Sequence, residues 1–252
     1  MTEKKSYAPG EFCWTELATG DYKAAKQFYG SLFGWTGNEM PMGDQPPYVM
    51  LQANGKTIGA LYENKQAKPG WVPYVAVAKA DDAAKKAKSL GGKPAEDPFD
   101  VMDAGRMANI QDPQGAKFAI WEAKNNKGAD VINEPNTMCW YELYSPDIKR
   151  SRKFYSGLFN SWKLKESPEY TEIHVADEMG IGGMMQISKE MQGMPPQWMP
   201  YFGVTDADAV AKKAKSLKGQ VFVEPRDIPN VGRFAILADP QGASFAIIKL
   251  AR

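Results

Sequence analysis

The chain has 252 residues, 43% of them hydrophobic and 24% charged, so it is long enough for two ordinary domains and has the composition of a globular protein. Its net charge of +1 gives no bulk electrostatic reason to expect a nucleic acid or an anionic membrane as partner. No stretch approaches the roughly 18 apolar residues of a membrane span, and no apolar run follows the first five residues, so we expect neither a membrane segment nor a secretory signal.

The first predicted elements are a strand at 12–17 and a helix that follows it. Gly20 and Asp21 end the strand, and aspartate is a favoured helix N-cap. Apolar residues at helical spacing then predict one buried stripe, made of Ala24, Ala25, Phe28, Tyr29, Leu32 and Phe33. Gly34 is expected to end the helix, since glycine readily takes the left-handed conformation there.

Two strand-like runs, 48–53 and 56–62, come next, joined by the strong hairpin signal Asn54-Gly55. A strand, a helix and two further strands then follow at 72–77, 81–90, 106–111 and 116–122. An Asp-Pro-Gln-Gly turn joins the last two strands. The first half is therefore predicted to contain a module of strand, helix and strands twice.

The second half repeats the first. The sequence Asp-Pro-Gln-Gly-Ala occurs at 112–116 and returns unchanged at 239–243, a separation of 239 − 112 = 127 residues. The sequence Cys-Trp-x-Glu-Leu at 13–17 returns at 139–143. Agreement at nearly constant spacing indicates a duplicated domain, with a polar linker between the copies. The predicted first domain, linker and second domain are residues 1–123, 124–135 and 136–252.

These modules, with an aromatic-rich first helix and a closing Asp-Pro-x-Gly turn, resemble the vicinal oxygen chelate superfamily of glyoxalase I, bleomycin-resistance proteins and extradiol dioxygenases. The resemblance covers both halves almost end to end and is to the two-domain, glyoxalase-related branch. It implies an α+β fold of two tandem glyoxalase-like domains. Each domain would consist of two βαβββ modules that form a curved, partly open barrel with a cleft. Because this fold hosts several chemistries and pure binders, it does not fix a function.

The resemblance also implies where metal ligands would lie, namely a His on the first strand of a module and a Glu on its last. In the first domain these positions fall on Trp14, Gly59 or Ala60, Tyr74 and Ala119. In the second domain they fall on Trp140, Gly182 or Gly183, Tyr201 and Ala246. None of these residues supplies the ligand types that divalent metals need, and the chain has one histidine. We therefore expect no metal site and no cofactor.

Two glutamates are candidate catalytic residues. Strand side chains alternate, so if Trp14 points into the cleft, Glu16 does too, and Trp140 and Glu142 repeat the pattern. A half-buried glutamate beside a tryptophan has a raised pKa and can act as a general acid or base near neutral pH. The alternative is a structural glutamate that accepts hydrogen bonds from a tyrosine, an arginine or the backbone.

Four aromatic residues are candidate ligand-binding residues. Tyr74 and Tyr201 are expected to project inward with Trp14 and Trp140, which would make each cleft aromatic with polar tips. The alternative is that these rings only fill the barrel. A register error of one residue would turn all of them outward.

His174 is a third candidate catalytic residue, because it stands where the first half has Gln52. The alternative is a hydrogen-bonded strand histidine. Cys13 and Cys139 are expected to be small buried residues on the face opposite Trp14 and Trp140, and they favour a reducing, cytoplasmic location.

Methionines crowd one region of the second half, at Met179, Met184, Met185, Met191, Met194 and Met199. We interpret them as lining a loop over the second cleft, since thioethers make adaptable binding surfaces. A copper(I) site is the alternative.

The sequence favours a metal-free protein that binds a small, partly aromatic metabolite in one or both clefts. It leaves open a metal-independent lyase or isomerase, in which Glu16 or Glu142 moves a proton while Tyr74 or Tyr201 polarises an oxygen. A metal-dependent glyoxalase- or dioxygenase-type enzyme with other ligands and a pure interaction module are further alternatives. We expect a small-molecule ligand, no nucleic-acid or membrane partner, and a monomer or weak homodimer.

Overall fold

The computed structural model describes residues 3–175, 180–191 and 193–251. Within these ranges the first half forms one sheet of nine strands. Its strands are β1 (Phe12–Thr19), β2 (Thr36–Met42), β3 (Gln45–Ala53), β4 (Lys56–Glu63), β5 (Gly70–Ala76), β6 (Lys93–Pro94), β7 (Phe99–Val101), β8 (Gly105–Gln111) and β9 (Lys117–Ala123). Its helices are α1 (Tyr22–Phe33) and α2 (Ala80–Ser89).

The second half forms a separate sheet, which has eight strands in the described ranges. These are β10 (Met138–Ser145), β11 (Trp162–Glu166), β12 (Tyr170–Val175), β13 (Gly182–Gln186), β14 (Gln197–Gly203), β15 (Gln220–Ile228), β16 (Gly232–Ala238) and β17 (Ser244–Leu250). Its helices are α3 (Ile148–Leu158), α4 (Ala207–Ser216) and a short 3₁₀ turn, Lys189–Met191. No helix in the described part of the chain is long and apolar enough to cross a bilayer.

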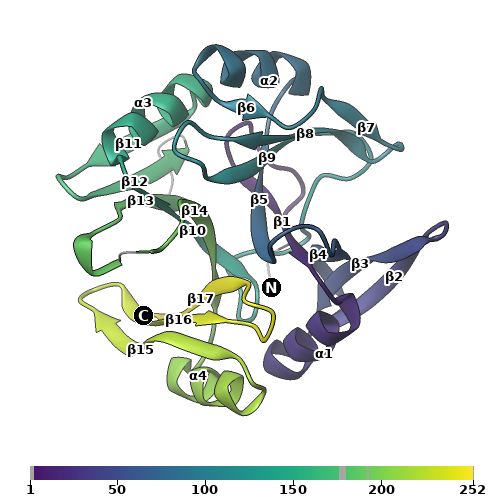
Figure 1. Cartoon of the computed structure of the whole chain (residues 1–252), viewed down its shortest axis with the longest axis vertical. Coiled ribbons are helices and arrows are strands. Elements are labelled where there is room, and N and C mark those ends of the chain that lie inside the picture. The colour runs from purple at the N-terminus through teal and green to yellow at the C-terminus, as the bar shows by residue number, and fades with distance from the viewer. Residues whose placement is uncertain (1–2, 176–179, 192, 252) are drawn as a thin grey trace.

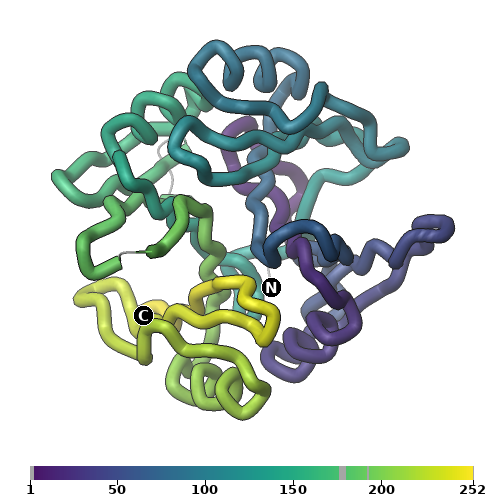
Figure 2. The backbone as a smooth tube through the Cα atoms, in the orientation of Figure 1, coloured from purple at the N-terminus to yellow at the C-terminus, as the bar shows by residue number. Residues whose placement is uncertain are grey.

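The strand order confirms two βαβββ modules in each half, with one extra strand in the first half, where β6 and β7 both pair with β8. In the first sheet β1 is parallel to β4, β5 is parallel to β9, and the modules join where β1 runs antiparallel to β5. In the second sheet β10, β13, β14 and β17 repeat these pairings. Each sheet curls into a partly open barrel (Figure 1). Figure 2 shows that each half is one continuous segment of the backbone, purple to teal and then green to yellow.

Helix α1 forms as the sequence predicts, except that Ala24, expected in the buried stripe, is exposed. The Asp21 carboxylate accepts hydrogen bonds from the amides of Lys23 and Ala24, which caps the first turn. Gly34 ends the helix at φ 77°, a conformation that favours glycine. The buried stripe consists of Ala25, Phe28, Tyr29, Leu32 and Phe33.

The helix-covered faces of the two sheets pack against each other. Helix α1 lies beside α4, and α2 lies beside α3 (Figure 1). The Phe28 ring is 6.4 Å from that of Phe245, and the Phe118 ring is 5.5 Å from that of Tyr155. One apolar core therefore crosses the boundary between the halves, while each concave face has its own cluster.

The repeated Asp-Pro-Gln-Gly turns connect the halves. Asp112 Oδ1 accepts hydrogen bonds from the backbone amides of residues 114–116, and its Oδ2 accepts one from the Tyr155 hydroxyl of the other half at 2.9 Å. Asp239 and Tyr29 form the matching pair at 3.1 Å. The repeated motif therefore has a structural role at the boundary.

One prediction about strand faces is wrong. A β-bulge between Phe12 and Trp14 places Cys13 in the same apolar cluster as Trp14. The matching bulge before Trp140 does the same for Cys139. An extra residue in the strand interrupts simple alternation, so neither cysteine lies on the opposite face.

Candidate functional site

The concave face of the first sheet brings the expected ligand positions together. Trp14 pairs with Tyr74 across β1 and β5, and Ala60 and Ala119 belong to the same apolar cluster. Ala60 pairs with Glu16 across β1 and β4, so its neighbour Gly59 faces the other side of the sheet. The cleft position on β4 is therefore Ala60.

The second sheet repeats this arrangement. Trp140 pairs with Tyr201 across β10 and β14, and Tyr201 and Ala246 belong to the concave cluster. A Cβ at Gly183 would lie 2.2 Å from the Tyr170 hydroxyl oxygen and 2.6 Å from Glu142 Oε1. Gly183, rather than Gly182, therefore faces this cleft.

The residues at these positions do not fit the metal that the superfamily resemblance implies. Rings, alanines and a glycine offer no imidazole, carboxylate or thiolate to a divalent ion. Within residues 3–175, 180–191 and 193–251, no three His, Cys, Asp or Glu side chains gather closely enough to hold a metal ion. The chemistry of the clefts must therefore be argued from their own side chains.

Glu16 is held by two tyrosines. Its Oε1 accepts a hydrogen bond from the Tyr48 hydroxyl at 2.5 Å, and its Oε2 accepts one from the Tyr74 hydroxyl at 2.8 Å. Burial raises the pKa of the Glu16 carboxyl, and both hydrogen bonds oppose that rise. The first cleft thus satisfies its own carboxyl, as the structural alternative for Glu16 anticipates.

Glu142 has a different environment in the second cleft. It is only 4% exposed, and its Oε2 accepts a hydrogen bond from the Tyr170 hydroxyl at 3.0 Å. Its Oε1 has no hydrogen-bond partner among the described residues. Burial raises the pKa of the Glu142 carboxyl to about 8, against the opposing effect of the Tyr170 hydroxyl and the neighbouring Trp140 indole N–H. One carboxyl oxygen is therefore left for another group.

A single sequence difference accompanies this asymmetry. Tyr201, the counterpart of Tyr74, has its hydroxyl 3.4 Å from the hydroxyl of Tyr144. Tyr144 stands where the first domain has Ala18, which has no hydroxyl to offer. Tyr74 therefore binds the glutamate of the first cleft, whereas its counterpart Tyr201 pairs with Tyr144 in the second cleft.

His174 lies at the edge of the second cleft. It is 9% exposed, and its Nε2 is 3.0 Å from Glu172 Oε2. A Cβ at Gly180 would lie 3.0 Å from the Trp140 ring and 3.5 Å from His174 Cε1, so the two rings flank the same glycine. The structure thus brings His174 near Trp140 and gives it a carboxylate partner.

The methionines divide between the two faces. Met185, Met191, Met194 and Met199 belong to the concave cluster of the second sheet. Met184 lies in the core between the halves, and Met179 falls outside the described residues. Four of the six methionines therefore do pack on the second cleft.

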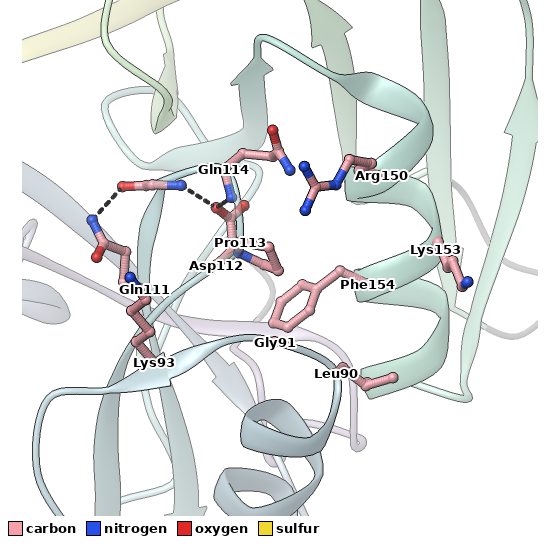
Figure 3. Close-up of a pocket in the computed structure, with 11 residues that line it drawn as sticks. Leu90, Gly91, Lys93, Gln111, Asp112, Pro113, Gln114, Arg150, Lys153 and Phe154 are labelled. Carbon is pink, nitrogen blue, oxygen red and sulfur yellow. Dashed lines mark hydrogen bonds between the residues drawn. The ribbon is translucent and has the colours of Figure 1, made fainter.

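Two cavities lie at the boundary between the halves, away from both clefts. The larger, of about 590 Å³, is lined by Asp112, Gln114, Arg150 and Phe154 among others (Figure 3). The smaller, of about 380 Å³, lies between the start of α2 and the end of α3. Neither is lined by a residue that the sequence analysis proposed as catalytic or ligand-binding.

Comparison with known sequences agrees with the duplication. The family described as Glyoxalase/Bleomycin resistance protein/Dioxygenase superfamily matches residues 12–120 and again 137–247. The chain is 38% identical over 259 residues to "Putative glyoxylase CFP32" of Mycobacterium tuberculosis, covering 99% of this chain and 98% of that protein. It is 30% identical over 274 residues to "Anthracycline biosynthesis protein DnrV" of Streptomyces peucetius, covering 97% and 94%.

Solved structures share the fold at low identity. The Mn(II)-bound glyoxalase from Novosphingobium aromaticivorans superposes with a TM-score of 0.68 at 16% identity, covering 96% of this chain and 82% of that one. The 2,3-dioxygenase LapB from Pseudomonas sp. KL28 gives a TM-score of 0.68 at 12% identity, covering 97% and 94%. Since the family matches both halves of the sequence, the chain belongs to the glyoxalase/bleomycin resistance/dioxygenase superfamily, as a tandem pair of glyoxalase-like domains.

Proposed function

We propose that this protein binds a small, partly aromatic organic metabolite in a glyoxalase-like cleft, without the metal centre of its superfamily. The observation that carries the proposal is the content of the concave faces. Trp14, Tyr74, Trp140 and Tyr201 occupy the positions where metal ligands are expected, beside alanines and a glycine. Apolar rings with a few polar tips are the usual lining of a small-molecule site.

The relatives support a small organic ligand. One is described as "Putative glyoxylase CFP32", and another is described as an anthracycline biosynthesis protein. We also expect the protein to act in the cytoplasm as a monomer or weak homodimer, without a nucleic-acid or membrane partner.

A ligand screen tests the proposal. Thermal unfolding with a library of aromatic acids, ketones, phenols and amines should show stabilisation by at least one class, since a ligand that binds only the folded state raises stability. Elemental analysis of the purified protein should find no stoichiometric transition metal. A metal bound one per chain, with stability lost on chelation, would contradict the metal-free proposal, as would a library without a single stabilising compound.

One observation favours a second candidate, a metal-independent lyase or isomerase. Glu142 combines a pKa of about 8 with an oxygen that has no partner in the described part of the chain. Such a carboxyl can exchange a proton with a substrate near neutral pH, and the Tyr201 hydroxyl could polarise a substrate oxygen. If so, E142Q should abolish turnover of a screened substrate while leaving its binding within a few fold. Equal turnover by E142Q would exclude this role.

A further inference from the structure

We propose that the second cleft alone takes the ligand, and that Glu142 binds it by donating a hydrogen bond from its carboxyl O–H to a carbonyl oxygen of the ligand. The ligand class is thus an aromatic or alicyclic ketone or quinone. The inference rests on the proposed small-molecule binding and adds to it the cleft, the residue and the functional group.

The first step is the difference between the two clefts. In the first cleft, Tyr48 and Tyr74 occupy both oxygens of Glu16, so a ligand would have to displace a hydroxyl that is already bonded. Trp121 also fills this cleft, at 7% exposure, where the second domain has the smaller Ile248. In the second cleft, Glu142 Oε1 needs no displacement, because no described residue bonds to it.

The second step is the protonation state of Glu142. The side chain is 4% exposed and lies among Trp140, Met199 and Tyr170, and it has no ion pair within the described residues. A buried carboxylate without a counter-charge is strongly disfavoured, so the neutral acid prevails. A neutral carboxyl has one O–H donor. With Oε2 accepting from Tyr170, we place the proton on Oε1, the oxygen that has no partner among the described residues.

The third step is what such a donor would bind. A folded protein with a buried donor that lacks an acceptor is less stable than one in which the donor is hydrogen-bonded. A ligand carbonyl would accept this hydrogen bond and restore the lost stability, whereas an ammonium group offers only donors and would require Glu142 to ionise. The Trp140 ring, beside the carboxyl, supplies an apolar face for the rest of the ligand.

The three tyrosines around Glu142 keep one charge state in the pH range of interest. The groups that face Glu142 are Tyr144 on its own strand, Tyr170, Glu172 and His174 on β12, Tyr201 on β14 and, through Tyr144, Arg226 on β15. Burial raises the pKa of all three tyrosines, that of Tyr144 to about 12. They therefore stay neutral between pH about 7 and about 9.

Calorimetric titration of the full-length protein with indanone, indane and aminoindane tests the proposal, because these compounds share one ring skeleton and differ at one carbon. At pH about 7 indanone should bind about tenfold more tightly than indane, as one added hydrogen bond in a buried site implies. Between pH about 7 and about 9 its affinity should fall about tenfold, since the fraction of protonated Glu142 falls by that factor around a pKa of about 8.

Matched variants locate the effect. Glu142→Gln keeps an N–H donor, so it should bind indanone without the pH dependence, and Glu142→Leu should reduce indanone to the affinity of indane. Glu16→Gln and Glu16→Leu, at the matching position of the first cleft, should leave binding unchanged. His174→Gln should retain the decline above pH about 8. If Glu142→Leu does not fold, the pH profile of Glu142→Gln decides the test alone.

Several outcomes would overturn the proposal: equal binding of indane and indanone, tighter binding of aminoindane with affinity rising with pH, or loss of binding in the Glu16 variants. If indane binds as well as indanone, small-molecule binding stands and only the carbonyl assignment fails. If none of the three binds, the carbonyl assignment fails, while the library screen still decides the proposed function.

Discussion

The two glutamates at matching positions of the repeat have different environments. Glu16 bonds to two tyrosine hydroxyls, whereas Glu142 bonds to one and leaves an oxygen without a partner among the described residues. The neighbouring difference between Ala18 and Tyr144 redirects one hydroxyl. The two repeated sites are therefore not equivalent, since one glutamate has both oxygens bonded and the other has one oxygen without a partner in the described chain.

The pKa of Glu142 predicts a pH-dependent stability. Its folded-state pKa is about 8 against an ordinary value of 4.5, so between these values the folded protein holds a proton that the unfolded chain has lost. Stability should therefore fall as pH rises through this window, by as much as about 4–5 kcal/mol. Urea unfolding at pH about 5 and about 8.5 should show a smaller fall for Glu142→Gln than for the native protein.

The comparison isolates the effect of Glu142, because the other carboxyls with a raised pKa are present in both proteins. These are Glu16, Asp112 and Asp239. Identical pH profiles for the two proteins would mean that Glu142 is ionised in the folded state across this range.

Substitution of Gly183 gives a steric test of the same site. A Cβ there would lie 2.2 Å from the Tyr170 hydroxyl oxygen and 2.6 Å from Glu142 Oε1, so alanine must displace one of them. Gly183→Ala should lower the free energy of unfolding by about 1–3 kcal/mol, as overpacking does. Gly70→Ala, where a Cβ meets nothing within 4 Å, should be nearly neutral when measured by the same urea titration. Equal stability of both variants would show that the second cleft has more room than the contacts indicate.

The site could be predicted from the sequence only where strands alternate regularly. Glu16 and Tyr74 were placed together by their period of two, and they do share a hydrogen bond. Tyr48 and Tyr170 were missed, because no local sequence pattern places their strands near the glutamates. The curl of each sheet brings the tyrosine hydroxyl to the glutamate carboxyl. The face of Cys13 was predicted wrongly because a bulge, which leaves no clear sequence signal, shifts the alternation.

At the scale of elements, the repeated turns bind the helices of the opposite half. Tyr155 on α3 donates to Asp112, Trp198 on β14 donates to the Tyr155 hydroxyl at 2.8 Å, and Tyr29, Asp239 and Trp71 repeat the chain of bonds. The sequence revealed the turn and its repetition but not this partner, since 155 − 112 = 43 residues separate the two side chains.

Removing the hydroxyl of either tyrosine should destabilise the whole molecule. Tyr155→Phe and Tyr29→Phe each leave a buried aspartate oxygen without its donor, which should lower the free energy of unfolding by about 1–3 kcal/mol. Tyr22→Phe, whose hydroxyl makes no hydrogen bond within the described residues, should change it by less than about 0.5 kcal/mol. If all three variants match the native protein in urea unfolding, the cross-domain bonds are not formed in solution.

Strand β2 shows the limit of periodicity at this scale. It is polar and exposed at the edge of the first sheet, so it carries no alternation of apolar residues, and no strand was predicted from its residues. Its pairing with β3 holds it in place. The core strands and both helices of each half were predicted well. Each of these elements buries one face, so its apolar residues recur at a regular spacing that can be seen in the sequence.

For the whole molecule, the two halves share one core. Phe12 of the first sheet lies 4.5 Å from Tyr141 of the second, and Trp35 donates a hydrogen bond to the Asn136 carbonyl oxygen at 2.7 Å. Neither half completes its apolar surface alone, although each encloses its own cleft. The boundary therefore couples the stability of one domain to that of the other.

This coupling predicts a single unfolding transition for the full chain. Far-ultraviolet circular dichroism and tryptophan fluorescence should give coincident urea curves, because losing one half exposes the apolar face of the other. The isolated first half, residues 1–123, should expose Phe28, Phe33 and Phe118, and so should either associate with a second copy or remain partly unfolded. Sedimentation analysis at several concentrations would detect that association. A stable monomeric first half, or two separate transitions in the full chain, would show that the shared core adds little to the stability of either domain.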